Sequence, residues 1–296
     1  MRTSTPQLKA VDSPNPIDFS HALASRIVPR HCARLHLIQV GCGGTGAHLA
    51  SHTARIGREC RAHYEEVRIT FYDHDTIEPK NIRRQQFCEA EVGYNKAEVL
   101  AYRLNTGWGL EIEAVPHKFT TKSLTFSHND TLTILLGCVD NAAARKALHR
   151  ALTPSSFSPG QTWWLDAGCT YAQAQVLIGN TTDPDRLRHS FDLPGICQSL
   201  PSPGWLHPEL LSPSKDDLMP TRQTCADRAP NEPQSLTINA LAAAHMADYL
   251  LRLLLTHDLR RYATYLDMNT GSVRSLATTD KLLDSFVSPS DPRGTN

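Results

Sequence analysis

The stretch Gly41-Cys42-Gly43-Gly44-Thr45-Gly46 decides the fold of this 296-residue chain. It follows the apolar run 35–40, which predicts a buried strand, and precedes residues 47–56, which predict a helix that ends at Gly57. A strand, a glycine-rich turn and a helix in this order predict a phosphate-binding unit. The free N–H groups and the positive dipole end of the helix attract phosphate oxygens.

Three glycines of this stretch have separate physical roles. Gly41 permits the tight turn, Gly43 lets the backbone approach a phosphate without a Cβ in the way, and Gly46 allows close packing of helix and strand. The turn alone leaves two alternatives open, namely a turn without a ligand and a site for NAD or FAD.

A second strand is predicted at residues 67–72, and it ends at Asp73. An acidic residue at this position commonly binds ribose hydroxyls. Asp73 follows Gly41 by 32 positions, whereas the usual spacing is about 20. The charged insert 57–66 accounts for the longer spacing, so the dinucleotide alternative stays open here.

Cationic and amide side chains follow this strand within residues 77–96. A dinucleotide needs little positive charge there, because its pyrophosphate lies on the helix N-terminus. A triphosphate with about four negative charges needs cations, and arginine offers a planar fork for bidentate contacts. A solvated basic loop is the alternative, but the number of such groups favours a triphosphate: Lys80, Asn81, Arg83, Arg84, Gln85, Gln86 and Lys96.

A further buried strand is predicted at residues 131–137, and the helix 142–151 follows it. Asp140 lies between them, at the strand end where ligands of open α/β sheets bind. A carboxylate there suits Mg²⁺, which usually takes one or two carboxylates together with substrate phosphates. The alternative role for Asp140 is the N-cap of the helix.

The whole pattern predicts an α/β fold with a doubly wound, mostly parallel, Rossmann-like sheet and closing strands near the C-terminus. The remaining predicted elements are a helix at 96–106, strands at 111–115, 163–167 and 174–178, a helix at 235–255 and strands at 261–267 and 272–276.

We expect five segments along the chain. Nine of the 19 prolines lie between Gly179 and Pro233, which marks a long irregular segment. The segments are an N-terminal arm (1–30), a nucleotide-binding domain (31–178), a proline-rich crossover loop (179–234), a helix and strands that complete the same domain (235–287) and a tail (288–296).

Composition argues against several functions. The net charge is zero, so nothing indicates a nucleic-acid or membrane partner. Residues 1–30 contain no apolar stretch typical of a secretory signal. Eight cysteines without close spacing indicate reduced thiols in the cytoplasm, and no Cys-x-x-Cys pair predicts a structural zinc site.

Four motifs in this order resemble the ThiF/MoeB/HesA group, the bacterial relatives of ubiquitin-activating enzymes. The similarity covers residues 34–178, with a weaker part from Thr224 into the helix after Ser235. Within this group the chain most resembles the ThiF-type protein of the plasmid-borne PRTRC cassette. The motifs are GCGGTG (41–46), DHDTIEPKNIRRQ (73–85), GYNKAEVLAYRLN (93–105) and GCVDN (137–141).

The resemblance implies an ATP-dependent adenylyltransferase that works as a homodimer. In this family the C-terminal carboxylate of a small ubiquitin-like (β-grasp) or sulfur-carrier-like protein attacks the α-phosphate of ATP. The products are an acyl-adenylate and pyrophosphate. By position, the resemblance places the phosphates at Gly41, Gly43, Gly44 and Gly46, the ribose at Asp73 beside Asp75, the triphosphate at Asn81, Arg84, Gln85 and Lys96, and Mg²⁺ at Asp140.

Cys225 is a candidate for a later transfer step. Arg222 and Arg228 flank it and favour the thiolate, and family members with a transferring cysteine carry it in a comparable loop. It would carry a thioester or persulfide, and the alternative is that it is a bystander. Two other functions stay open for the whole chain: a nucleotide-binding, non-catalytic scaffold of a plasmid maintenance system, and an NAD- or FAD-dependent oxidoreductase.

Overall fold

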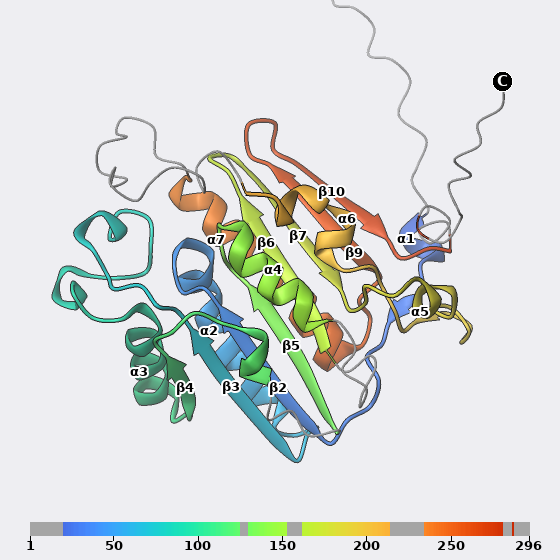
Figure 1. The fold of residues 1–296 in the computed structure, drawn as a ribbon, viewed down its shortest axis with the longest axis horizontal. Helices are drawn as coiled ribbons and strands as arrows, with labels where there is room; N and C mark the ends of the chain where they lie inside the picture. Colours follow the sequence, from blue (N-terminus) through green and yellow to red (C-terminus); the bar gives the residue numbers. More distant parts are fainter. Residues whose placement is uncertain (1–19, 125–129, 153–161, 214–233, 281–285, 287–296) are drawn as a thin grey trace, which may run out of the picture.

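The computed structural model describes residues 20–124, 130–152, 162–213, 234–280 and 286. Its centre is an eight-stranded sheet. The strands are β2 (Arg34–Val40), β3 (Glu66–Tyr72), β4 (Ile112–Val115), β5 (Thr131–Gly137), β6 (Thr162–Cys169), β7 (Gln173–Gly179), β9 (Arg261–Asp267) and β10 (Ser272–Ala277). Their order across the sheet is β10-β9-β7-β6-β5-β2-β3-β4 (Figure 1).

Strands β6, β5, β2, β3 and β4 run parallel to one another. On the other side of β6, β7 is antiparallel to β6, β9 to β7, and β10 to β9. The predicted mostly parallel α/β fold with antiparallel closing strands is therefore confirmed.

Helices cover both faces of this sheet. On one side lie α2 (Gly44–Cys60), α3 (Lys96–Trp108) and α7 (Leu236–Leu251), and on the other lies α4 (Ala142–Ala151) (Figure 1). We call these sides the α2 face and the α4 face. In β5, Ile134 belongs to the core on the α2 face, while Leu135 packs with Leu148 and Trp164 on the α4 face. This alternation follows from the two-residue period of a strand.

The strand order brings three loops together at one edge of the sheet. β2 lies between β3 and β5, and Val40 is in register with Tyr72 on one side and Gly137 on the other. The chain leaves each of these strands at its carboxyl end, toward the glycine turn, Asp73 and Asp140. This is the point where ligands of open α/β sheets bind.

The helix after the glycine turn is longer than the sequence indicates. α2 continues through Gly57 to Cys60, so the prediction that it ends at Gly57 is wrong. A Cβ at Gly57 would lie 2.7 Å from Cδ1 of Ile69, so this glycine serves close packing of the helix on β3. A glycine that is required by packing cannot be distinguished locally from one that ends a helix.

The first part of the proline-rich segment contains regular structure. It forms α5 (Pro184–Arg188), β8 (Ile196–Cys197), α6 (Pro203–Leu206) and a 3-10 helix (Pro208–Leu211). Each of these helices begins at a proline, whose fixed φ suits the first helical position and whose missing N–H is not needed there. Residues 214–233 of the predicted crossover loop lie outside the described residues.

The described end of the N-terminal arm packs against the same segment. It contains α1 (Ser20–Leu23) and β1 (Arg26–Ile27), and β1 pairs in parallel with β8 as a separate two-stranded sheet. The residues around β8 thus pair with this arm, and among the described residues of the predicted crossover loop before Gln234, the 3-10 helix Pro208–Leu211 is the part that lines the cavity described below.

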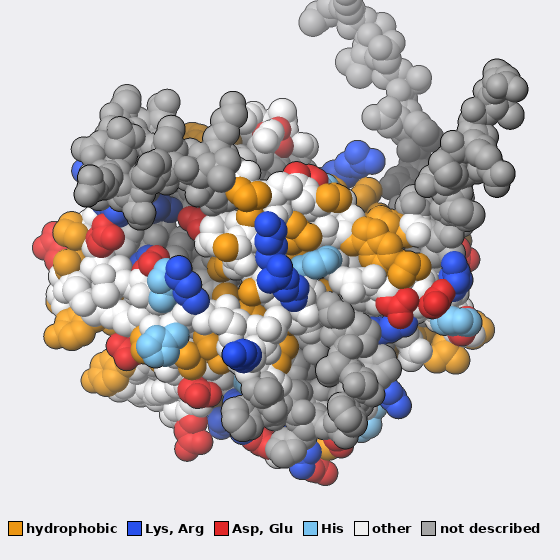
Figure 2. Space-filling view, in the orientation of Figure 1, with side chains coloured by type: hydrophobic (Ala, Val, Ile, Leu, Met, Phe, Trp, Pro, Cys, Tyr) orange, Lys and Arg blue, Asp and Glu red, His pale blue; other side chains and the backbone are white. Residues whose placement is uncertain are grey.

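By length and composition, one helical stretch among the described residues could cross a membrane, Thr237–Thr256. Half of this window is buried inside the fold, where α7 packs on α2 and β6. A π-helix, Arg252–Thr256, forms its last part. On the molecular face shown in Figure 2, side chains of both charge signs are interspersed, in keeping with the net charge of zero.

Candidate functional site

Backbone contacts fix two glycines of the turn. Gly41 has a φ of +95°, and a Cβ there would overlap the carbonyl oxygen of Cys138. A Cβ at Gly46 would overlap the carbonyl oxygen of Gly41. At Gly43 the nearest atom to a Cβ would be Nε2 of Gln85, 3.6 Å away, so a Cβ would fit there without overlap, and Gly43 lines the cavity. The turn therefore has the tight backbone and the open approach that a phosphate needs.

Asp73 is held against the glycine turn. Its Oδ2 accepts a hydrogen bond of 2.6 Å from the backbone N–H of Cys42, and its Oδ1 accepts one of 2.8 Å from Asp75. Burial raises the pKa of the Asp73 carboxyl, although these two backbone N–H groups and Lys96 oppose the shift. No side chain caps the N-terminus of α2, which begins at Gly44. The turn thus presents an acid and a helix N-terminus side by side.

Lys96 is a buried cation at the start of α3, with 6% of its surface exposed. Its Nζ lies 3.1 Å from Oδ2 of Asp75, which is itself half exposed. Asn95 holds this arrangement in place, because its Oδ1 caps α3 and its Nδ2 donates to the carbonyl oxygens of Asp73 and Asp75. The ammonium group is therefore fixed next to Asp73.

The polar loop after β3 has both structural and free groups. The side chain of Asn81 accepts a hydrogen bond from the N–H of Glu78 and so stabilises a 3-10 helix, Pro79–Asn81. Arg84 donates from Nη1 to Oε1 of Gln234, 3.2 Å away, just before α7. The buried Oε1 of Gln85 has no partner among the described residues. A donor from a bound ligand would satisfy this oxygen.

Asp140 is exposed and lines the same cavity. The alternative that it caps α4 is wrong, because Asn141 is the N-cap and accepts a hydrogen bond from the N–H of Ala144 at 2.9 Å. Within the described part of the chain, no side chain bonds the Asp140 carboxylate. A carboxylate left free in this way is the hard oxygen ligand that Mg²⁺ prefers.

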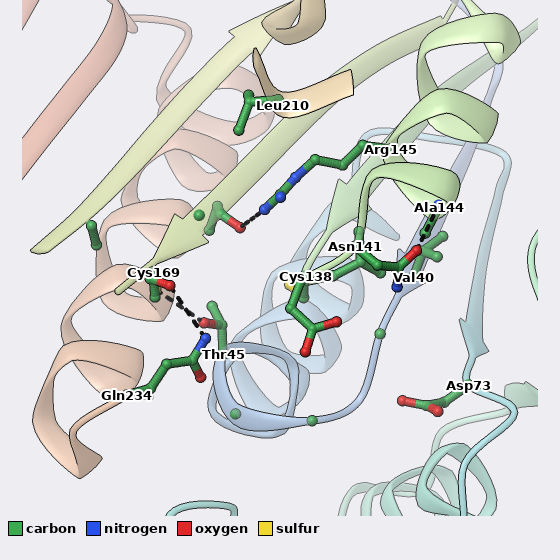
Figure 3. Close-up of a pocket in the computed structure, with 18 of the residues that line it drawn as sticks. Val40, Thr45, Asp73, Cys138, Asn141, Ala144, Arg145, Cys169, Leu210 and Gln234 are labelled. Atoms are coloured by element: carbon green, nitrogen blue, oxygen red, sulfur yellow. Dashed lines mark hydrogen bonds between the residues drawn. The ribbon is translucent and has the colours of Figure 1, made fainter. Parts of the chain in front are cut away.

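These residues line one cavity of about 1220 Å³. Figure 3 shows Asp73 and Asn141 on either side of the glycine turn, with Arg145 reaching across from α4 toward β6. Arg83 and Gln86 are not among the residues that line the cavity. The structure brings the other predicted nucleotide-site residues of the turn and the loops together at this cavity: Gly41, Gly43, Gly44, Asp73, Asp75, Lys80, Asn81, Arg84, Gln85, Lys96 and Asp140. Gly46 lies behind them in α2, and Cys225 lies outside the described residues.

The sequence analysis missed an ion pair beneath this cavity. Arg145, with 8% of its surface exposed, donates from Nε to Oδ2 of the fully buried Asp166 at 3.2 Å and from Nη2 to the carbonyl oxygen of Ala167. Burial raises the pKa of the Asp166 carboxyl, and Arg145 opposes that shift.

A local signal for this ion pair is present in the sequence. Asp166 interrupts an apolar strand, and Arg145 follows three alanines in a helix. A carboxylate inside a buried strand requires a cation or hydrogen bonds from elsewhere. The identity of that partner depends on the packing of α4 on β6, which no local pattern specifies.

A model of the ThiF family matches residues 30–282 of this chain. No curated protein sequence matches it. Among solved structures, the crystal structure of PaaA has a TM-score of 0.52 at 15% identity, with 82% of this chain and 64% of that chain covered.

Two structures of MccB from E. coli are similar to the same extent. The complex with ATP has a TM-score of 0.50 at 16% identity, and the complex with AMPCPP and MccA has a TM-score of 0.50 at 17% identity. In both cases 82% of this chain and 63% of that chain are covered. The chain thus spans less than two thirds of the length of these structures. At identities this low, the structural similarity shows a shared fold and nothing more specific.

Proposed function

Because this chain belongs to the ThiF family, we propose that it is an ATP-dependent adenylyltransferase. Its proposed substrate is the C-terminal carboxylate of a small ubiquitin-like or sulfur-carrier-like protein. One observation carries the proposal: Arg84 from the connection after β3, Lys96 from the start of α3 and Asp140 from the connection after β5 line one cavity with the glycine turn. A dinucleotide site would need only the turn and Asp73.

The proposed reaction needs positioning and charge stabilisation. An oxygen of the partner's C-terminal carboxylate attacks the α-phosphorus of ATP, and an oxygen–phosphorus bond forms. The bond between the α-phosphorus and the bridging oxygen breaks, and pyrophosphate leaves with the electron pair, so nothing is oxidised or reduced. Cations that are already fixed in place stabilise the charge that develops on the phosphates.

Each residue has a role that follows from its place. Asp73 accepts the ribose hydroxyls, and the N–H groups at the start of α2 receive phosphate oxygens. Lys96 supplies a fixed positive charge because Asn95 and Asp75 restrain it. Arg84 supplies bidentate donors to the triphosphate, and it exchanges its contact with Gln234 for the phosphate oxygens.

Asp140 would hold Mg²⁺, which fits because its carboxylate is exposed in the cavity and Asn141 takes over the cap of α4. When bound, the ion would neutralise part of the phosphate charge. The ligands of similar structures support this proposal, since MccB from E. coli has been solved with ATP and with AMPCPP and MccA. Homodimerisation, a cytoplasmic location, the plasmid cassette and a transfer role for Cys225 stay predictions.

Exchange of labelled pyrophosphate into ATP tests the proposal directly. The assay uses the full chain, Mg²⁺ and a panel of small β-grasp proteins that end in Gly-Gly. We expect exchange that requires the free C-terminus of the partner. Arg84→Ala should reduce it by about a hundredfold, the scale of losing one stabilising donor. Asp140→Ala should abolish the dependence on Mg²⁺.

The control is Arg58→Ala, which removes an exposed arginine of α2 that does not line the cavity. Exchange at the normal rate in Arg84→Ala would mean that the triphosphate does not lie at this loop. Calorimetry separates the other functions: NAD binding with the affinity of ATP would favour an oxidoreductase. Tight ATP binding without exchange would favour a non-catalytic scaffold.

A further inference from the structure

The cavity extends well beyond the part that we assign to the nucleotide. Its volume of about 1220 Å³ exceeds the range of roughly 300–1000 Å³ that is usual for one small ligand. The additional part is lined by side chains of the antiparallel strands, among them Gln175, Tyr265 and Arg274. These strands can therefore present side chains to a second substrate.

One row of residues crosses four strands on the α4 face. Gly168 of β6 is in register with Gln175 of β7, Gln175 with Tyr265 of β9, and Tyr265 with Arg274 of β10. Residues that lie opposite each other in neighbouring strands point to the same face. Figure 3 shows Arg145 on this face, above the end of β6. The row is thus a polar track from the end of β6 to the edge strand.

The inner end of this track lies at the floor of the cavity. Gly168 has no side chain, and a Cβ there would lie 3.4 Å from Nη2 of Arg145 and 3.5 Å from the side chain of Gln175. The polar ends of Arg145 and Gln175 therefore lie in contact distance above this glycine and form the inner end of the track. Arg145 cannot turn away from the track, because Asp166 and Ala167 hold its guanidinium.

Tyr265, in the middle of the track, is held in place by His207, which follows α6. Oη of Tyr265 lies 2.8 Å from Nε2 of His207, whose Nδ1 lies 2.8 Å from Oε1 of Glu209. The hydrogen bond from His207 lowers the pKa of the Glu209 carboxyl. The 3-10 helix Pro208–Leu211 is thus tied to β9 and forms one wall of the cavity.

The outer end of the track has a cation without a fixed acidic partner. The two acids near it are engaged elsewhere: Glu209 with His207, and Asp267 with Gln173 and the turn N–H of Asn269. Arg274 is exposed, and no carboxylate of the described residues lies within 4.0 Å of its guanidinium nitrogens. The track therefore ends in a positive charge that faces the cavity.

We propose that Arg274 determines substrate specificity by selecting an acidic side chain in the C-terminal tail of the partner protein. This inference rests on the proposed function, since it assumes that the tail enters along the track toward the glycine turn. Neighbouring strands are about 4.8 Å apart and an extended chain advances about 3.3 Å per residue. Five strand spacings separate β2, where the glycine turn begins, from β10, so the selected side chain lies about seven residues before the reacting carboxylate.

Binding of short peptides tests this inference separately from catalysis. The probes are fluorescein-labelled peptides of about ten residues, ending in Gly-Gly with a free carboxylate. They differ only in carrying Glu or Lys at about the seventh position from the end. Fluorescence anisotropy with the full chain, Mg²⁺ and a non-hydrolysable ATP analogue gives each Kd. We expect the Glu peptide to bind about five- to tenfold tighter at low salt, and the preference to shrink at high salt.

Two variants complete the experiment. Arg274→Glu should reverse the preference, so that the Lys peptide binds more tightly. Arg58→Glu is the control: it changes the net charge of the protein by the same amount, but at a site on α2, and should leave the preference for the Glu peptide unchanged. Equal affinities for the two peptides, or no binding of either, would overturn the inference. A preference that persists in Arg274→Glu would also overturn it. The charge preference could reverse in Arg274→Glu although the wild-type protein shows no pyrophosphate exchange. That result would support the role of Arg274 in peptide binding and would reject the adenylation proposal.

Discussion

At the residue scale, the glycines of the phosphate-binding turn differ in what requires them. Gly41 and Gly46 are required by contacts with the backbone, whereas a Cβ at Gly43 would meet the side chain of Gln85 at 3.6 Å without overlap. The sequence predicts all three as one motif. Only the structure separates the glycines whose Cβ would overlap the backbone from the one where a Cβ would fit.

Replacement of Gly46 by alanine should therefore destabilise the fold whether or not a nucleotide is present. The new Cβ would overlap the carbonyl oxygen of Gly41, and neither backbone segment can move freely. We expect a loss of about 3 kcal/mol in the free energy of unfolding, measured in urea. Gly107→Ala in α3 is the control, since a Cβ there meets nothing within 4 Å. It should stabilise the protein by about 0.5–1 kcal/mol; equal effects of the two changes would contradict this explanation.

His36 in β2 should make stability dependent on pH. Burial lowers the pKa of this imidazole to about 4, and Arg68 adds to the shift. Its Nε2 lies 2.9 Å from Oγ1 of Thr70. In the unfolded chain the pKa is about 6.5, so the unfolded state takes up a proton first as the pH falls. The stabilising contribution is complete above about pH 6.5 and is lost progressively toward pH 4, by about 3 kcal/mol in total.

The variant His36→Gln tests this directly, because glutamine can keep a hydrogen bond to Thr70 but does not titrate. Between pH 7 and pH 4.5, the wild type should lose about 2–3 kcal/mol more free energy of unfolding than the variant. Chemical denaturation at several pH values measures both profiles. Parallel profiles would show that His36 is already protonated in the folded state or that its pKa is not lowered.

At the element scale, two helices that line the site begin with an asparagine cap. Asn141 accepts one hydrogen bond at the start of α4. Asn95 accepts two at the start of α3 and also donates to the carbonyl oxygens of Asp73 and Asp75. The first cap stabilises a helix, whereas the second also fixes the loop that carries Asp73.

We predict that the two caps respond differently to alanine. Asn141→Ala should reduce the free energy of unfolding by about 1 kcal/mol, the usual cost of losing a cap. Asn95→Ala should reduce it by about 2–3 kcal/mol, because two further bonds are lost in a buried position. It should also weaken nucleotide binding in calorimetry by about tenfold, since Asn95 caps the helix that begins at Lys96 and holds the backbone carbonyl of Asp73. Equal losses of stability and unchanged affinity in Asn95→Ala would contradict this view.

The elements themselves were largely predictable from the sequence. The periodicity of residues 131–137 and 142–151 predicts β5 and α4 with the same bounds as in the structure. The end of α2 and the short elements between 179 and 213 were not predicted. Gly57 and the prolines are ambiguous locally, because packing decides whether such residues end a helix, lie within it or begin it.

At the scale of the whole molecule, the site depends on strand order. β2 lies between β3 and β5, so loops that are far apart in the sequence start next to each other. The antiparallel strands then continue the sheet on the side of β6 and extend the cavity. The nucleotide part and the track to Arg274 are therefore two ends of one surface.

The sequence by itself determined the strand–turn–helix units and the residue types of the nucleotide site, because periodicity and turn chemistry are local properties. It also placed Asp73 and Asp140 at strand ends. Only the tertiary structure decided that Asn141 rather than Asp140 caps α4, that Arg145 pairs with Asp166, and that Gln175, Tyr265 and Arg274 share one row. These contacts depend on strand pairing and helix packing between distant segments, and no local pattern encodes which segments meet.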